Sequence, residues 1–385
     1  MPMRTFLSWI LIFIAFVGSS QMTTAEVVAK IESLQISKDP FYEKGLFPVQ
    51  RSWNLSRNPV EDNTIFFTAS IVYTLQTVLP SLSLDAKFSA EAMMRAAREA
   101  YPLYQSRNGE PTYNFWQTVA PDLPFPNGNR WISNPKMRLP DDLDTSVILA
   151  MSTEDDTLKV QLRKKMVNYA ARPERSEAVR NTLEKYETSL AYEAWFAKDM
   201  PQTFDICVMS NALLFALSEA YPMNTHDLAT IDLVTQIMLD GDLAKDIDYV
   251  SHHTLSLPVI YYHVARLLEA DDKGLLHTVR PMVIDELVRL QVTAANEMEK
   301  MLVQTSLLRL GIHPSLELDY VQLEAEMDEF VFFTVKPFLG NPQLAFLEAI
   351  VSDISWQCEA YNWTLYLEHL HFKRTYTANL SGASE

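Results

Sequence analysis

A helical repeat of apolar residues runs from about residue 61 to 375, and it limits the fold more than any other feature of the chain. In its first stretch, Ile65, Ala69 and Val72 recur at steps of four and three residues, which places them on one face of a helix. The alternation typical of strands is almost absent, and only nine Gly are present for the tight turns that an all-β fold needs. The pattern predicts an all-α protein.

The same periodicity divides the chain into separate helices. After one helix that follows Thr64 and another that ends at Pro102, it predicts helices over 145–151, 157–171, 177–197, 205–220, 227–239, 253–269 and 279–310, then two that begin near 316 and 342 and end near 372. Residues 26–60 are expected to form an extended arm against the body, and residues 377–385 a polar tail.

Three of the expected helices begin alike, with a polar cluster followed by a strongly apolar run. The clusters lie at 141–146, 205–211 and 251–254, and their spacing of about 50 to 65 residues leaves room for a helix, a return helix and two loops. Apolar helices that alternate with more charged ones indicate an inner and an outer ring, an α/α toroid over residues 61–376. The polar starts then face one shared cavity, with these candidate site residues: Asp141, Asp142, Asp144, Asp205, Asn211 and His253.

A long irregular segment covers residues 109–140 and is rich in aromatic residues, among them Trp116 and Trp131. Loops of this length inside a compact domain are usually functional or disordered, and the aromatic content argues against disorder. We expect an ordered loop over one end of the fold.

Residues 1–25 have the pattern of a signal peptide. Arg4 precedes a twelve-residue apolar run from Phe6 to Val17, too short for a bilayer span, and Thr23 and Ala25 occupy the −3 and −1 positions of a cleavage site. An uncleaved anchor is the alternative. The pattern predicts an exported protein, periplasmic or secreted, without stable membrane insertion after cleavage.

The charge of the chain limits its partners. The formal net charge is −17, and removal of Arg4 with the signal takes it to −18. Such a balance repels phosphate backbones and anionic surfaces, so nucleic acid is excluded as a partner. A small molecule or a carbohydrate in the cavity is the ligand that we expect.

The segment Pro140 to Ser146, together with the Tyr-Asn-Phe-Trp run at 113–116, resembles the terpenoid cyclase and protein prenyltransferase superfamily of α/α toroids. In class II cyclases an Asp-x-Asp-Asp-Thr motif opens an inner helix, and its central Asp protonates the substrate. When the segment is aligned on Thr145, Asp141 and Asp144 match the outer acids, but Leu143 occupies the central position. The Gln/Trp repeats of those cyclases are not evident. The resemblance therefore implies the fold more than the reaction.

The three acids of this segment lie within one helical turn. Crowding of negative charge raises the pKa of at least one carboxyl group, which is a route to a general acid near neutral pH. Capping of the helix is the structural alternative. With Asp205 on a neighbouring inner helix, the acids also meet the need of a glycosidase for two carboxylates, and Trp116, Trp131 and Trp195 are candidates for stacking on sugar rings.

Two further enzyme classes use other residues of the same clusters. Asp205, Cys207 and His253 are similar to the zinc ligands of protein prenyltransferases. Polysaccharide lyases use the residue types of Asn211 and of the His and Tyr residues at 249, 252, 253, 261 and 262. The two cysteines, Cys207 and Cys358, either pair or remain buried thiols.

The leading hypothesis is acid–base chemistry on an apolar or carbohydrate substrate, like that of a cyclase or a glycosidase, without a metal or another cofactor. The alternative is a non-catalytic binding module that uses the cavity and the aromatic loop and depends on Trp116 or Trp131. An enzyme loses turnover when Asp144 becomes Asn, whereas a binding module tolerates that change.

Overall fold

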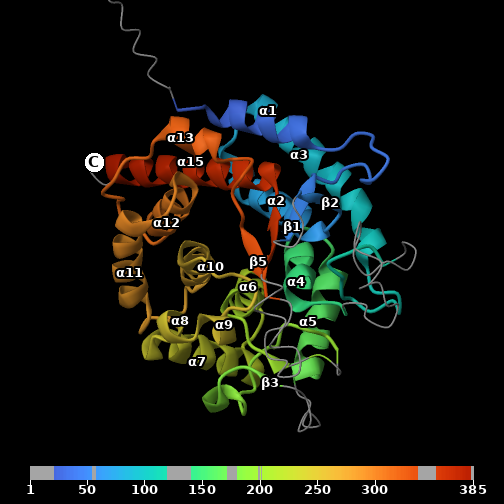
Figure 1. The fold of residues 1–385 in the computed structure, drawn as a ribbon, viewed down its shortest axis with the longest axis vertical. Helices are drawn as coiled ribbons and strands as arrows, with labels where there is room; N and C mark the ends of the chain where they lie inside the picture. The colour runs from blue at the N-terminus through green and yellow to red at the C-terminus, as the bar shows by residue number, and fades with distance from the viewer. Residues whose placement is uncertain are drawn as a thin grey trace, which may run out of the picture.

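The computed structural model describes residues 21–53, 58–118, 140–170, 180–197, 200, 202–336 and 353–382. Within these residues the protein is mostly helical, with fourteen α-helices and six short strands (Figure 1).

Six apolar helices pack in a cyclic order. They are α2 (Ile65–Val78), α4 (Leu143–Met151), α6 (Ile206–Ser218), α10 (Leu257–Ala270), α12 (Glu297–Arg309) and α15 (Glu359–Gly382). Each of them packs against the next, and α15 packs against α2, so that the contacts close on themselves. In α6 every residue from Ile206 to Ala216 is buried. A helix that is buried on all sides belongs to the interior of a fold.

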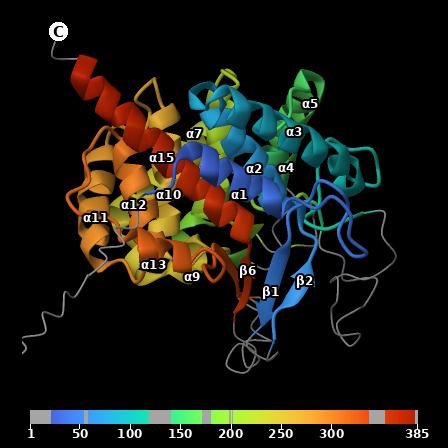
Figure 2. The same cartoon turned by 90° about the horizontal axis from the view of Figure 1, so that it is seen from above.

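A second set of helices covers the first from outside. These are α1 (Thr24–Leu34), α3 (Leu84–Ala100), α5 (Asp156–Ala170), α7 (Thr225–Asp240), α11 (Arg280–Thr293) and α13 (Tyr320–Ala325). Each of them packs against an inner helix: α3 on α2, α5 on α4, α7 on α6, α11 on α10, α13 on α12, and α1 on α15. Figure 2 shows α1 alongside α15. In α5 only one face is buried, with Leu162, Met166 and Tyr169, as expected of an amphipathic surface helix. Between α7 and α10 lie two short helices, α8 (Asp242–Lys245) and α9 (Ile247–Val250).

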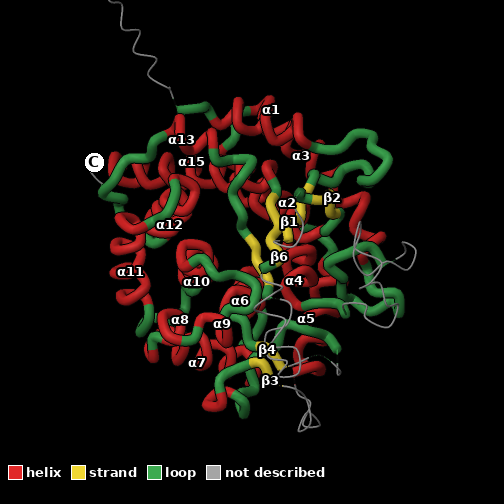
Figure 3. The backbone as a smooth tube through the Cα atoms, viewed as in Figure 1, coloured by secondary structure: helices red, strands yellow, loops and turns green. Residues whose placement is uncertain are grey.

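A small antiparallel sheet corrects the prediction of an all-α protein. It consists of β1 (Val49–Trp53), β2 (Val60–Asp62), β5 (Phe333–Val335) and β6 (Ile354–Gln357), in the order β2-β1-β6-β5. Arg51 of β1 lies opposite Val60 on one side and Trp356 on the other, so the sheet joins the two ends of the chain (Figure 3). Two shorter strands, β3 (Arg180–Asn181) and β4 (Gln202–Thr203), pair in parallel. Strands of two to five residues are too short to show a clear alternation in sequence.

Four other segments differ from the sequence expectations. The predicted arm at 26–60 contains α1 and β1, and the expected cleavage site after Ala25 lies in the first turn of α1, which Thr23 caps. The segment 180–197 holds a strand and a 3₁₀ turn in place of the second half of a helix. The predicted helix 279–310 is two helices, and the predicted tail is helical through Gly382.

Two apolar clusters fill the interior. The larger one joins α2, α4, α15 and the four-stranded sheet, and the second one joins α6, α7, α10 and α11. Within the described part of the chain, none of the helices combines the length and the hydropathy that a membrane span requires.

Candidate functional site

Aspartate residues cap two neighbouring inner helices. Asp142 is the N-cap of α4, and its Oδ1 accepts a hydrogen bond from the backbone N–H of Thr145 at 2.7 Å. Asp205 caps α6 in the same way, with Oδ1 accepting from the N–H groups of Cys207 (2.8 Å) and Val208 (3.2 Å). Both residues are therefore N-caps, as the capping alternative expected for the acids that begin α4. Because each cap uses one carboxylate oxygen, the other oxygen remains available for a second role.

The second oxygen of Asp205 holds His253, which lies in the loop before α10. Oδ2 accepts from the backbone N–H of His253 at 3.0 Å and lies 3.3 Å from its Nδ1. Burial alone would raise the pKa of Asp205, but the hydrogen bond and the charge of His253 outweigh it and hold this pKa below its usual range. Burial alone would lower the pKa of His253, but the hydrogen bond with Asp205 and the charge of Asp205 outweigh burial and raise this pKa above its usual value. The two residues form an ion pair in which Nε2 is the nitrogen left for proton transfer, and 14% of the His253 side chain is exposed.

Asp142 and Asp144 lie within electrostatic reach of His253. Burial raises the pKa of Asp142 to about 7, against the hydrogen bond from Thr145. Burial and then the charge of Asp205 raise the pKa of Asp144 to about 6, against the hydrogen bond from Asn211. The charge of His253 lowers both values. Two carboxyl groups that titrate near neutral pH thus share one site with a histidine–aspartate pair, which is a feature of acid–base centres.

Asn211 fixes the position of Asp144. Its Nδ2 donates to Oδ1 of Asp144 at 2.7 Å, and its Oδ1 lies 3.4 Å from Nδ1 of His263. Burial lowers the pKa of His263 to about 3, so this ring is neutral, and in the tautomer that carries its hydrogen on Nδ1 it donates to the amide oxygen of Asn211. The neutral histidine thereby orients the amide so that its NH₂ group faces Asp144. No signal in the sequence marked His263, since it lies inside an apolar helix.

Asp141 does not join this cluster. Its Oδ2 accepts a hydrogen bond from the Thr112 hydroxyl at 2.6 Å, and its backbone oxygen accepts from the N–H of Phe196. Asp141 precedes the N-cap of α4, so its side chain lies outside the first helical turn. Of the six predicted residues, the structure brings together these five: Asp142, Asp144, Asp205, Asn211 and His253.

Aromatic rings surround His253. Phe333 of β5 stacks on its ring at 5.7 Å between centroids, and Trp195 meets it edge to face at 6.0 Å. Phe115 stacks on Phe333 at 5.9 Å. All three aromatic residues are partly exposed, so they form a wall against which a ligand can pack. The sequence contains no signal for β5, the three-residue strand that carries Phe333.

Trp116, a second tryptophan that the sequence analysis singled out, does not line this wall. Trp116 is buried, and its indole N–H donates to Asp62 Oδ1 at 2.8 Å. Trp356 donates to Oδ2 of the same carboxylate at 3.1 Å, and Arg51 pairs with it at 2.9 Å. Trp116 therefore anchors the aromatic loop to the sheet. Trp131 and residues 119–139 lie outside the described residues.

The surroundings of Cys207 do not favour the zinc alternative. Burial and the charges of Asp205 and Asp144 raise the pKa of this thiol well above its usual value, whereas a zinc ligand must be a thiolate. Among the residues that the structure describes, no three His, Cys, Asp or Glu side chains are grouped so that they could hold a metal ion. Cys207 and Cys358 are both buried free thiols and do not form a disulfide.

The surroundings of the tyrosines in α10 do not favour the lyase alternative. Tyr262 is fully buried and donates to Glu368 Oε2 at 2.6 Å. Tyr261 is part of the second apolar cluster, and Tyr249 is exposed. Burial raises the pKa of Tyr261 and Tyr262, which makes proton loss harder.

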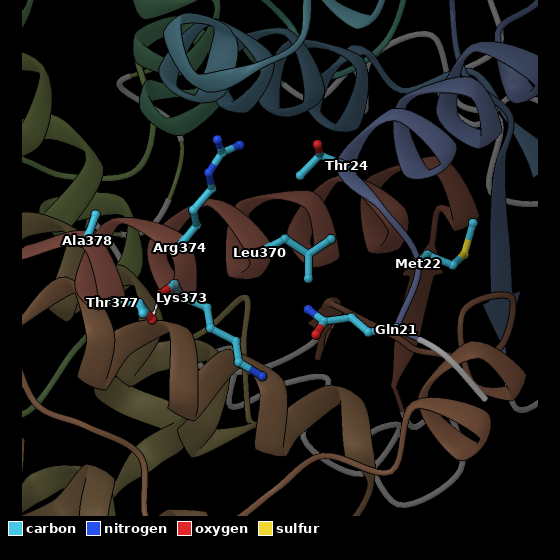
Figure 4. Close-up of a pocket in the computed structure, with 8 residues that line it drawn as sticks. All are labelled: Gln21, Met22, Thr24, Leu370, Lys373, Arg374, Thr377 and Ala378. Atoms are coloured by element: carbon cyan, nitrogen blue, oxygen red, sulfur yellow. Dashed lines mark hydrogen bonds between the residues drawn. The ribbon is translucent and has the colours of Figure 1, made fainter. Parts of the chain in front are cut away.

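A separate pocket of about 500 Å³ lies between the start of α1 and the last turns of α15. Figure 4 shows its lining residues: Gln21, Met22, Thr24, Leu370, Lys373, Arg374, Thr377 and Ala378. None of them is a carboxylate or a histidine, so this pocket lacks the side chains for the acid–base chemistry described above.

Comparisons with protein-family models, curated proteins and solved structures found no match to this chain. The carboxylates and the histidine at the ends of α4, α6 and α10 are therefore the basis on which a function is proposed.

Proposed function

We propose that this protein is an exported acid–base enzyme built on an α/α toroid. The cyclic packing of α2, α4, α6, α10, α12 and α15, each covered by an outer helix, supports the toroid. The signal pattern of residues 1–25 supports export. The substrate is an apolar or carbohydrate molecule that packs against the aromatic wall of Phe115, Trp195 and Phe333.

One observation carries the enzymatic function: two buried carboxyl groups with raised pKa values lie beside the Asp205–His253 ion pair. Between pH 6 and 7, Asp142 with a pKa of about 7 mostly keeps its proton, and Asp144 with a pKa of about 6 mostly loses it. Asp142 then serves as the general acid and Asp144 as the general base. The imidazolium of His253 stabilises negative charge that develops between them.

The resemblance to the cyclases fits this scheme only in part. Leu143, which occupies the position of the cyclase proton donor, has a buried side chain, and its N–H donates to the carbonyl of Ala194 at 2.8 Å. The acid that we assign is instead Asp142, one residue earlier. The chemistry is therefore protonation by a capping aspartate and not by the centre of the cyclase motif.

The test compares Asp142→Asn and Asp144→Asn with the neighbouring control Asp141→Asn, on 4-nitrophenyl glycosides and on linear isoprenoids. Each site variant should lose about 10²–10⁴-fold in turnover while keeping its fold by circular dichroism, and the control should stay near wild type. Turnover of the wild type should be highest between pH 6 and 7. Equal losses in all three variants, or no turnover on either substrate class, would contradict an acid–base enzyme.

A binding module remains the second candidate, because the aromatic wall alone can hold a ligand. In that case Asp144→Asn leaves ligand affinity unchanged, and Trp195→Ala reduces it. Trp116 no longer suits this test, since its substitution disrupts the buried Asp62 cluster.

A further inference from the structure

His253 lies in the loop between α9 and α10, so contacts from other elements must hold it in place. Its backbone N–H donates to Oδ2 of Asp205 at 3.0 Å. Its backbone carbonyl accepts a hydrogen bond from the N–H of Thr334 in β5 at 3.1 Å. The backbone of His253 is therefore tied to the N-cap of α6 through its N–H and to the sheet through its carbonyl.

Thr334 can make this contact because β5 is an edge strand. Within the described part of the chain, the sheet has the order β2-β1-β6-β5, so β5 has a neighbouring strand on one side only. Thr334 lies opposite Ser355 of β6. In an antiparallel pair, successive residues alternate between those that bond to the neighbouring strand and those whose N–H points away from it. The outward N–H of Thr334 is used for the His253 loop, which covers the edge at this point.

The ring of His253 is held by the residue before Thr334. Phe333 stacks on it with 5.7 Å between centroids and 17° between the ring planes. Phe333 in turn meets Trp356 of β6 edge to face at 5.3 Å, and Trp356 donates to the buried carboxylate of Asp62. The orientation of the imidazole therefore depends on a series of ring contacts that begins in the core of the sheet.

An ion pair joins the residue after β5 to α9, the helix that precedes the His253 loop. Nζ of Lys336 lies 2.6 Å from Oδ1 of Asp248. The two side chains are 29% and 33% exposed, and a pair as exposed as this stabilises only weakly. The hydrogen bond of Thr334 and the stacking of Phe333 are therefore the stronger contacts between β5 and the loop.

The geometry points to Phe333 and Thr334 as positioning residues that hold the imidazole of His253 against Asp205. This inference rests on the proposed function, because it assigns to β5 the placement of the histidine that stabilises charge between Asp142 and Asp144. It gives Phe333 a second role besides its place in the aromatic wall. When either contact is removed, we expect the ion pair of His253 with Asp205 to loosen.

Nuclear magnetic resonance of the histidine rings tests this placement without a substrate. The His253 signal is the one that is missing from His253→Gln. Because Asp205 raises the pKa of His253 in the wild type, this pKa should fall toward its usual value in Phe333→Leu and in Thr334→Pro, which lacks the N–H donor. Proline suits an edge strand where the N–H points outward. Both variants should keep the helical circular dichroism of the wild type.

Matched substitutions separate placement from general damage. Phe333→Tyr keeps the stacked ring and Thr334→Val keeps the N–H, so both should retain the wild-type pKa of His253. Phe196→Leu removes a partly buried ring that meets Tyr169 edge to face, and it should leave this pKa unchanged. An unchanged pKa of His253 in both Phe333→Leu and Thr334→Pro overturns the inference, and so does an equal fall in Phe196→Leu.

Turnover separates this inference from the proposed function. Thr334→Pro should lower kcat by up to about 10²-fold, the effect of a displaced catalytic group, and should leave KM unchanged because Thr334 is not part of the aromatic wall. If the pKa of His253 shifts as expected but the wild type turns over neither substrate class, the proposed function alone is contradicted. If turnover requires Asp142 and Asp144 but Thr334→Pro changes neither kcat nor the pKa of His253, the inference alone is contradicted.

Discussion

At the scale of single residues, Asp142 serves both the helix and the site. Its Oδ1 caps α4 through the Thr145 N–H, and its carboxyl group is buried beside Asp144 and His253. The sequence predicted a raised pKa from the crowding of Asp141, Asp142 and Asp144. In the structure burial is the main cause and the charge of Asp144 is a smaller one, while Asp141 faces Thr112. The residue types could be recognised in the sequence, but their burial depends on neighbouring helices and could not.

The raised pKa of Asp142 makes stability depend on pH. An unfolded Asp loses its proton near pH 4, whereas the folded protein keeps it until about pH 7. The folded state therefore binds an extra proton in this window, and stability falls as the pH rises through it. Asp142→Asn removes this cost but keeps a good N-cap. It should stabilise the protein by about 1–4 kcal/mol at pH 8 and by almost nothing at pH 4.

Urea unfolding of the wild type and of Asp142→Asn at several pH values measures this difference, with Asp141→Asn as the matched control. A stability gain that is the same at pH 4 and pH 8 would show that the carboxyl group is not the cause.

At the scale of elements, N-cap residues and apolar runs in the sequence predicted most of the helices, whereas the short strands were not predicted. The starts of α4 and α6 follow from Asp142 and Asp205, which cap them. The predicted helix 279–310 is interrupted because Asn296 caps a new helix, with its side chain accepting from the N–H of Glu299. The sheet depends on pairing between β1 and β6, from opposite ends of the chain, which no local pattern shows.

A buried ion pair joins the outer helices α5 and α7. Arg163 of α5 forms two hydrogen bonds with the carboxylate of Asp227 of α7, and the hydroxyl of Tyr192 donates to the same carboxylate. Asp227 is fully buried. Arg163→Ala leaves this charge without its partner and should reduce the free energy of unfolding by about 3–5 kcal/mol.

Chemical denaturation of Arg163→Ala tests this expectation against Lys165→Ala on the same helix. Lys165 pairs with Glu110 at 3.0 Å on the surface, so its loss should cost less than about 1 kcal/mol. Comparable losses in the two variants would argue against a special role for the buried pair.

At the scale of the whole molecule, repetition in the sequence marked the starts of α4, α6 and α10, and the toroid inferred from them implied a closed ring without indicating which helices close it. Three polar helix starts indicated that α4, α6 and α10 share one end, and their side chains do interact there. The contact between α2 and α15 brings together helices near the two ends of the chain. The sequence contains no local signal for such a contact. The aromatic wall of Phe115, Trp195 and Phe333 also forms only through tertiary packing, because its three residues come from distant parts of the chain.

Closure of the helical cycle through α15 makes the fold depend on its last helix. Five apolar or aromatic side chains of α15 are nearly fully buried: Tyr361, Leu365, Tyr366, Leu367 and Leu370. Each contributes about 1.5–3 kcal/mol, so together they match the whole stability of a typical domain.

A chain that ends after Gln357 should therefore lose cooperative unfolding and bind a hydrophobic dye. A chain that ends after Tyr376 loses, among the described side chains, only the exposed ones at 377–379 and should keep a melting temperature within a few degrees of wild type. Cooperative melting of the shorter chain near the wild-type temperature would show that the remaining helices are stable without closure.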